Sequence, residues 1–182
     1  MSEAVAETIP GPFEATGTSP SEAFEALYRS SFPRVYGYVA TLLRDRSAAE
    51  EVTAQAFERA YRKRRSFRPS RGTEEAWLFG IARNAALDEL RRRKRRANLE
   101  AEPEDVHAAG AAELADTALR REVVRAALGR LAPRERELVA LKFAGGLSND
   151  EIARVVGISP TNVGTRLHRT LEKLRKDCDE DA

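Results

Sequence analysis

Apolar residues recur every three or four positions through most of this 182-residue chain, which is the spacing of amphipathic α-helices. Pro, Gly and Ser cluster between the periodic segments and so mark where helices end. The pattern predicts an all-α fold in which order begins at Ser19 and persists to about Lys176. Residues 1–18 are polar and rich in Pro, Gly and Thr, which predicts a disordered N-terminal extension.

Several helix boundaries can be predicted from short local signals. A capping box, in which a Ser and a Glu three residues later satisfy the first backbone N–H groups of a helix, occurs at Ser19, Ser47 and Ser148. Thr73 is predicted to cap a further helix. Pro33 is predicted to break or kink the first helix, because proline lacks a backbone N–H.

The segment 76–96 is predicted to be one long helix whose two faces differ. Its apolar arc includes Leu78, Phe79 and Ala82, whereas Arg83 and Asn84 lie on the opposite face. The helix ends in the sequence RRRKRR. A buried face, a polar face and a basic end suit a helix that lies along nucleic acid. An ordinary amphipathic helix with a solvated charged end is the alternative.

The basic loop before this helix, residues 62–72 (RKRRSFRPSRG), strengthens the nucleic-acid interpretation. Its six cations surround Phe67, and Trp77 follows shortly after. Cations track phosphates and aromatic rings stack on unpaired bases, so this composition is typical of single-strand binding. In the alternative, Phe67 fills the core and the cations only keep the loop soluble.

Charge is distributed unevenly along the chain, although the formal net charge is only +2. Residues 62–96 contain thirteen Lys or Arg and four Asp or Glu, whereas residues 97–118 contain six acids and no Lys or Arg. We therefore predict two small helical domains, residues 19–96 and 119–176, joined by a flexible acidic linker at 97–118. Residues 177–182 form an acidic tail.

The second domain contains the sequence pattern of a helix-turn-helix motif. Ala153 supplies the small residue where the two helices cross, and Gly157 supplies the turn residue that tolerates positive φ. Ile152, Val156 and Val163 supply buried apolar positions on both sides of the turn. The polar side chains of the second helix suit base edges and phosphates in a major groove. A helical hairpin that binds no DNA is the alternative.

Several classes of function find no support in the sequence. The single cysteine, Cys178, excludes an intrachain disulfide, and the two histidines, His107 and His168, suggest no metal site or catalytic triad. No secretory signal and no membrane-spanning run is recognisable. We therefore expect a cytoplasmic protein that is not an enzyme and that needs no cofactor, metal or small-molecule substrate.

Four stretches together resemble one protein family. They are FEALYRSSFPRVYGYV, AAEEVTAQAFERAY, AWLFGIARNAALDELRRRKRR and LAPRERELVALKFAGGLSNDEIARVVGISPTNVGTRLHRTLEKLR. Their order and spacing resemble a bacterial RNA polymerase sigma factor of the extracytoplasmic-function (ECF) class, over about residues 21–96 and 119–176. The resemblance implies a dissociable polymerase subunit that recognises the −10 and −35 promoter elements and promotes strand opening.

The resemblance also implies a role for three sets of residues. The surface that docks on the clamp of the polymerase largest subunit would contain Glu50, Glu51, Gln55, Phe57 and Glu58. The reader of the −10 element would contain Arg62, Lys63, Arg64, Arg65, Phe67, Arg68, Arg71, Trp77, Arg83, Asn84, Asp88, Arg91 and Arg92. The reader of the −35 element would contain Ser159, Thr161, Asn162, Thr165, Arg166, His168 and Arg169.

The implied partners are core RNA polymerase, through its clamp and flap, promoter DNA as duplex and as melted non-template strand, and an anti-sigma factor. The protein would act in the cytoplasm at the nucleoid. An anti-sigma factor could instead hold it at the inner membrane face, without membrane insertion of this chain.

The sequence departs from the family pattern at two places. Ala54 and Gln55 stand where many members have Gln and an acid, so affinity for core polymerase would rest more on Glu50 and Glu51. Gly164 replaces a common Lys or Arg, which removes one DNA contact. Two other functions remain as alternatives: a conventional helix-turn-helix regulator, and a DNA-processing enzyme such as a recombinase, for which no nucleophile or carboxylate cluster is recognisable.

Overall fold

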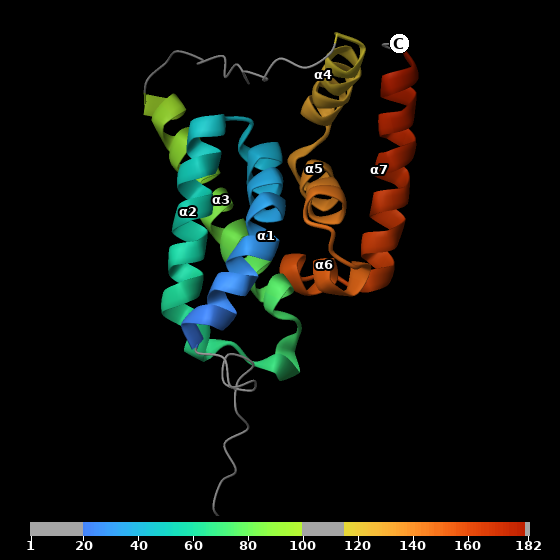
Figure 1. Ribbon diagram of the computed structural model, residues 1–182. Coiled ribbons are helices and arrows are strands. Elements are labelled where there is room, and N and C mark those ends of the chain that lie inside the picture. Colours follow the sequence, from blue (N-terminus) through green and yellow to red (C-terminus); the bar gives the residue numbers. More distant parts are fainter. Residues whose placement is uncertain (1–19, 100–114, 181–182) are drawn as a thin grey trace, which may run out of the picture.

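The computed structural model describes residues 20–99 and 115–180, and these residues form seven α-helices and no strand (Figure 1). The predicted N-terminal extension, most of the predicted linker and the last two residues of the tail lie outside the described residues. The all-α prediction is confirmed. The helices are α1 (Pro20–Leu43), α2 (Arg46–Lys63), α3 (Glu74–Leu99), α4 (Ala115–Arg130), α5 (Pro133–Val139), α6 (Asn149–Val156) and α7 (Pro160–Glu180).

Helices α1, α2 and α3 pack pairwise on one another and bury the predicted apolar stripes between them. Val35 and Tyr38 of α1 and Leu78 and Phe79 of α3 are fully buried. The Tyr38 and Phe79 rings meet edge to face with centroids 5.6 Å apart. Pro33 lies within α1 without ending it, so the predicted break at this position does not occur.

Helix α2 begins earlier than its capping-box sequence predicts. Asp45, not Ser47, is the N-cap residue, and its carboxylate accepts a hydrogen bond of 3.0 Å from the Ala48 N–H. The same carboxylate lies 2.7 Å from the Arg93 guanidinium of α3. This second partner explains why Asp45 replaces Ser47 as the cap, because only Asp45 can also hold the end of α3 in place.

Helices α6 and α7 form the predicted helix-turn-helix. Ser148 and Glu151 make the reciprocal bonds of a capping box at the start of α6. Gly157 ends that helix with φ 76° and ψ 38°, the left-handed conformation that favours glycine. The Ser159 hydroxyl then caps α7 by accepting a 3.2 Å hydrogen bond from the Asn162 N–H.

The N-terminal helices α1–α3 and the C-terminal helices α4–α7 lie against each other and share one hydrophobic core. Helix α5 and the π-helical turn that follows it, Ala140–Ala144, pack on α1, and α6 packs on α3. A Cβ added to Gly145 would lie 3.0 Å from the Phe79 ring, which shows how closely the two groups approach. The predicted domain boundaries stay a prediction, but the two groups are in contact in this structure.

We predict that Asp45→Ala lowers the free energy of unfolding by about 1 kcal/mol, the usual effect of losing an N-cap. The hydrogen bond from the Ala48 N–H keeps the pKa of Asp45 below its ordinary value. Burial opposes this shift, and Arg93 adds to it. Because the folded state favours the carboxylate, its stabilisation is present above the unfolded pKa of about 3.9 and is lost as the pH falls below it.

Urea unfolding of the wild type and variant tests this prediction, with a difference that is constant above about pH 5 and shrinks as the pH is lowered from about 4 toward 2.5. Ser47→Ala is the matched control and should leave stability almost unchanged, because the Ser47 side chain is exposed and caps nothing. A larger effect of Ser47→Ala than of Asp45→Ala would contradict this account of the cap.

Gly164→Ala should stabilise the protein by about 1 kcal/mol, because glycine inside a helix is less favourable than alanine by that amount. An added Cβ would make an ordinary contact of 3.5 Å with the Asn149 amide of α6. Gly157→Ala is the opposite case, because its positive φ would strain an alanine by roughly 1–2 kcal/mol. Thermal unfolding of the two variants should therefore shift the midpoint in opposite directions.

Candidate nucleic-acid interface

The basic loop leaves α2 through two short 3₁₀ turns, Arg64–Ser66 and Pro69–Arg71, before Thr73 caps α3. Most of its cations are exposed, but Phe67 is only 6% exposed. The Phe67 ring packs edge to face on Trp77 with centroids 5.6 Å apart. Phe67 therefore supports the loop by packing on Trp77, as the alternative interpretation expects, and its contact with a base stays a prediction. Trp77 is the partly exposed ring.

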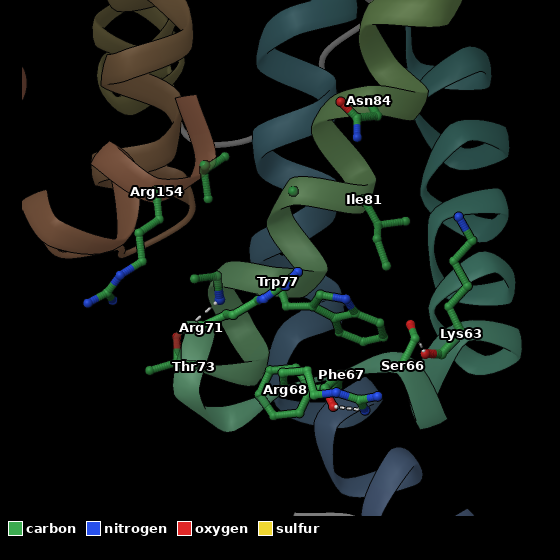
Figure 2. Close-up of a pocket in the computed structure, with 13 residues that line it drawn as sticks. Lys63, Ser66, Phe67, Arg68, Arg71, Thr73, Trp77, Ile81, Asn84 and Arg154 are labelled. Carbon is green, nitrogen blue, oxygen red and sulfur yellow. Dashed lines mark hydrogen bonds between the residues drawn. The ribbon is translucent and has the colours of Figure 1, made fainter. Parts of the chain in front are cut away.

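A pocket of about 560 Å³ opens beside Trp77, between the loop and α3 (Figure 2). A cavity of this size is typical of small-molecule and nucleotide sites. The residues that line it include four cations and no acid. Eleven of them come from α2, the loop and α3, and two come from α6. They are Lys63, Ser66, Phe67, Arg68, Arg71, Thr73, Ala76, Trp77, Gly80, Ile81, Asn84, Arg154 and Val155.

The polar face of α3 is divided between exposed and paired side chains. Asn84 is exposed and lines the pocket. Arg83 is not directed to solvent, because its Nε lies 2.6 Å from the Glu137 carboxylate of α5. Asp88 and Arg91 form an exposed ion pair of 3.0 Å with each other. Of the residues predicted to read the −10 element, Asn84 and Trp77 therefore lie at the same pocket, whereas Arg83 is bound to Glu137 of α5.

The basic end of α3 is partly neutralised by buried acid. Glu89 is 8% exposed and pairs with both Arg92 and Arg93. Burial raises the pKa of Glu89, but hydrogen bonds from Arg93 and Arg92 outweigh that effect and leave the pKa below its ordinary value. Arg92 and Arg93 thus help to fix α3, which lowers their availability for DNA.

Two loop cations also have partners within the protein. The Arg62 guanidinium pairs with Glu58 at 2.6 Å, one helical turn away on α2. The Arg64 guanidinium lies 4.0 Å from the centroid of the Tyr61 ring and donates a 2.7 Å hydrogen bond to the Tyr61 carbonyl. The exposed cations on the loop are Arg62, despite its pairing, together with Lys63, Arg65, Arg68 and Arg71.

The first turns of α7 present the predicted duplex-reading side chains to solvent. Val163 and Leu167 face the core, and the predicted contact residues are all exposed. Arg166 is oriented by Asn162, whose side-chain oxygen accepts a 2.8 Å hydrogen bond from Nε. The exposed set is Ser159, Thr161, Asn162, Thr165, Arg166, His168 and Arg169.

Four of the five residues predicted to dock on polymerase are at least partly exposed on α2. Glu50, Glu51 and Glu58 are exposed, and Gln55 is half-buried. Phe57 is only 4% exposed and packs among aromatic rings of α1, so it cannot contact a partner directly. This corrects its predicted role.

An aromatic row along α1 and α2, defined by Phe24, Tyr28, Phe32, Tyr36 and Tyr61, was missed by the sequence analysis. Tyr28 and Tyr61 are each 41% exposed. The helical spacing of these rings in α1 was visible in the sequence, but spacing alone does not separate a core stripe from an exposed one.

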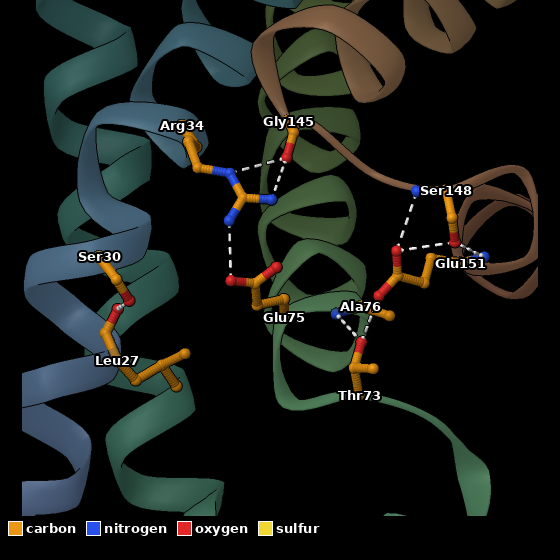
Figure 3. Close-up of polar contacts among 9 residues, drawn as sticks. All are labelled: Leu27, Ser30, Arg34, Thr73, Glu75, Ala76, Gly145, Ser148 and Glu151. Atoms are coloured by element: carbon orange, nitrogen blue, oxygen red, sulfur yellow. Dashed lines mark hydrogen bonds and ion pairs between the residues drawn. The ribbon is translucent and has the colours of Figure 1, made fainter.

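Polar contacts join the two groups of helices close to the candidate interface (Figure 3). The Arg34 guanidinium donates hydrogen bonds to the Gly145 carbonyl at 2.9 Å and to the Glu75 carboxylate at 2.7 Å. The Thr73 hydroxyl donates a 2.7 Å hydrogen bond to Glu151 of α6. No sequence signal pointed to these contacts, because their partners are far apart in the chain.

No group of His, Cys, Asp and Glu within residues 20–99 and 115–180 is arranged to hold a metal ion. Over the same residues, no helix is long and apolar enough to cross a membrane.

Comparisons with known proteins identify the family. Residues 27–96 match the model of Sigma-70 region 2, and residues 121–174 match that of Sigma-70, region 4. The chain is 39% identical over 158 residues to RNA polymerase sigma factor CarQ of Myxococcus xanthus, covering 85% of this chain and 88% of that protein. It is 34% identical over 170 residues to ECF RNA polymerase sigma factor SigE of Mycolicibacterium smegmatis, covering 90% of this chain and 65% of that protein.

Solved structures agree with this assignment. The sigma factor RpoE, in complex with the anti-sigma factor NepR from Bartonella quintana, shares the fold with a TM-score of 0.71 at 23% identity, covering 88% of this chain and 99% of that one. CnrH, in complex with the cytosolic domain of CnrY, has a TM-score of 0.66 at 28% identity, covering 89% and 91%. The two matched regions and these relatives show that this chain belongs to the RNA polymerase sigma factors of the ECF class.

Proposed function

We propose that the protein initiates transcription with its two DNA-facing surfaces acting at different promoter elements. The single observation that carries this proposal is the pairing of a basic, ring-lined pocket on α3 with an exposed recognition helix, α7, in one sigma-factor chain. The pocket suits an unpaired base, and α7 suits an intact major groove. Strand opening at one element and duplex binding at the other need these two kinds of surface.

At the −10 element, we assign one unpaired base of the melted non-template strand to the pocket beside Trp77. The Trp77 ring offers a stacking face, worth roughly 1–3 kcal/mol for each stacked base. Asn84 at the rim offers an amide, which can both donate and accept hydrogen bonds with a base edge. Lys63, Arg68 and Arg71 then neutralise phosphates on either side of that base.

Core polymerase docks on α2, in this proposal, through an exposed acidic row of Glu50, Glu51 and Glu58. The partly exposed rings of Tyr28 and Tyr61 supply the apolar part of the same surface. Aromatic side chains are enriched at interfaces because they bury much area with little loss of conformational freedom. The charged clamp of the polymerase largest subunit is the expected partner.

We propose that regulation follows the pattern of the structural relative RpoE, which was solved with the anti-sigma factor NepR. We propose that an anti-sigma factor also binds this chain, that the protein acts in the cytoplasm at the nucleoid, and that it catalyses no reaction itself. The two-domain division at residues 19–96 and 119–176 belongs to the same proposal.

Run-off transcription tests this function directly. Purified bacterial core polymerase is incubated with sheared DNA from the source organism, with and without the protein, and the transcript starts are mapped. New starts that share upstream elements support the proposal. Tight duplex binding by the protein alone, with no new starts, would instead indicate a conventional helix-turn-helix regulator.

Asn84→Ala should reduce promoter opening by about 5–150-fold, the effect of losing about 1–3 kcal/mol of base discrimination. Permanganate reactivity of melted thymines measures opening, and native gel electrophoresis measures the complex with core polymerase, which should be unchanged. Asn98→Ala, an exposed asparagine at the end of the same helix, is the matched control. Loss of polymerase binding in Asn84→Ala would refute the assignment.

Arg166→Ala should weaken recognition of the −35 element, because its guanidinium projects from the exposed face of α7. Transcription from promoters with single substitutions in that element should become less selective at one or two positions. Arg175→Ala, an exposed arginine further along α7, should lack this effect. An unchanged preference in Arg166→Ala would remove this residue from the proposed reader.

A further inference from the structure

Gly80 lies inside α3 and lines the pocket beside Trp77, although glycine destabilises a helix interior relative to alanine. A glycine is usually required where the backbone has a positive φ or where another atom packs too closely for a Cβ. Neither condition holds at Gly80. Its φ is not positive, and an added Cβ would meet no side chain and no backbone outside its own helix within 4 Å, among the residues that the structure describes. At Gly145, by contrast, an added Cβ would lie 2.6 Å from the Leu141 carbonyl oxygen. The fold therefore does not explain the glycine at position 80.

Gly80 lies between the two groups of the pocket that are suited to a base. Trp77 precedes it by three residues and Asn84 follows it by four, so the three residues lie on one face of the helix. Figure 2 shows the Trp77, Ile81 and Asn84 side chains in succession along α3, and all of these residues line the pocket. With a rise of 1.5 Å per residue, Trp77 and Asn84 are about 10 Å apart along the helix axis. The surface between the ring and the amide is therefore bare helix backbone at Gly80, flanked by Ile81.

A planar base can use this bare stretch only while no side chain occupies it. A base that stacks on Trp77 gains from the overlap of the rings, and its edge must then cross position 80 to reach the Asn84 amide. A side chain at this position would stand between the two groups and leave room for only one of the contacts. The phosphates on either side of the base are attracted separately, because the described residues that line the pocket include four cations and no acid.

We propose that Gly80 is a specificity-determining residue of the −10 reader, whose missing side chain lets one unpaired base stack on Trp77 and hydrogen-bond to Asn84 at the same time. This inference rests on the proposed function, because it deepens the assignment of a base to this pocket. Discrimination between bases then depends on the space at Gly80 as well as on the amide, whereas attraction of the strand depends on the cations. Stability is given up at this position in favour of recognition, as is common at functional sites.

Gly80→Ala separates a functional role from a structural one. Alanine is a better helix former than glycine, and the space around position 80 accommodates its methyl group. We expect Gly80→Ala to raise the midpoint of thermal unfolding by about 2–4 °C. A lower midpoint in this variant would mean that the fold itself needs glycine here, and would overturn the proposal.

Base recognition is measured with holoenzyme assembled from core polymerase and the full-length protein. The holoenzyme is incubated with a pool of single-stranded oligonucleotides of randomised sequence, and the bound fraction is sequenced and compared with that bound by core polymerase alone. The wild type should enrich one base at one position. Gly80→Leu should reduce this enrichment by about tenfold and Gly80→Ala by about twofold, because a larger side chain fills more of the path to Asn84. The total amount of bound DNA should stay the same, since no cation is removed.

Two comparisons make the result specific to this position. Gly164→Ala is the matched control, because it replaces a glycine inside α7, away from the pocket lining, and should leave the enrichment unchanged. In an Asn84→Ala background, Gly80→Leu should reduce the enrichment by a smaller factor than it does in the wild type, because the hydrogen bond that the leucine blocks is already lost.

Each outcome decides a different point. Unchanged enrichment in Gly80→Leu would overturn the role of Gly80 and leave the assignment of a base to the pocket standing. An equal effect of Gly80→Leu with and without the Asn84 amide would overturn the claim that one base makes both contacts. If the wild type enriched no base, the pocket assignment in the proposed function would itself fail, and the role of Gly80 would fail with it.

Discussion

Ion pairs between the basic segment 62–96 and acids on other parts of the protein help to fix how the helices pack. Residues 62–96 carry thirteen cations, which would repel one another in a compact fold without nearby negative charge. Asp45 and the buried Glu89 neutralise the end of α3 from within the N-terminal helices. Glu137 neutralises Arg83 from the C-terminal helices. The pocket beside Trp77 has no acid in its lining, so the positive potential is concentrated there.

The cations of residues 62–96 fall into two sets, one paired with carboxylates of the protein and one exposed to solvent. Cations such as Arg83 and Arg93 hold helices together through their carboxylate partners, whereas most cations of the basic loop are exposed. Salt would affect the two sets differently, because buried pairs are screened much less than exposed charges. Higher ionic strength should therefore weaken DNA binding strongly, through counterion release, while the contact between α3 and α5 persists.

The sequence allowed the helices to be predicted well because periodicity and caps are local signals. The turn at Gly157 and the caps at Thr73 and Ser148 depend on a few adjacent residues, and they lie where the pattern predicted. The cap of α2 was misassigned because Asp45 is selected by Arg93, which lies far along the chain. Phe57 and Phe67 were placed in binding surfaces because aromatic residues suit both cores and interfaces, and only packing distinguishes the two.

What sequence patterns could not reveal was the contact between the two groups of helices. Arg83 has the spacing of an exposed residue on α3, and Glu137 looks like an ordinary polar residue of a short helix. Their pairing depends on how α5 and the turn after it are placed against α1 by core residues such as Leu138 and Leu141. A long-range contact of this kind has no periodicity, so only the three-dimensional structure shows that Arg83 pairs with Glu137.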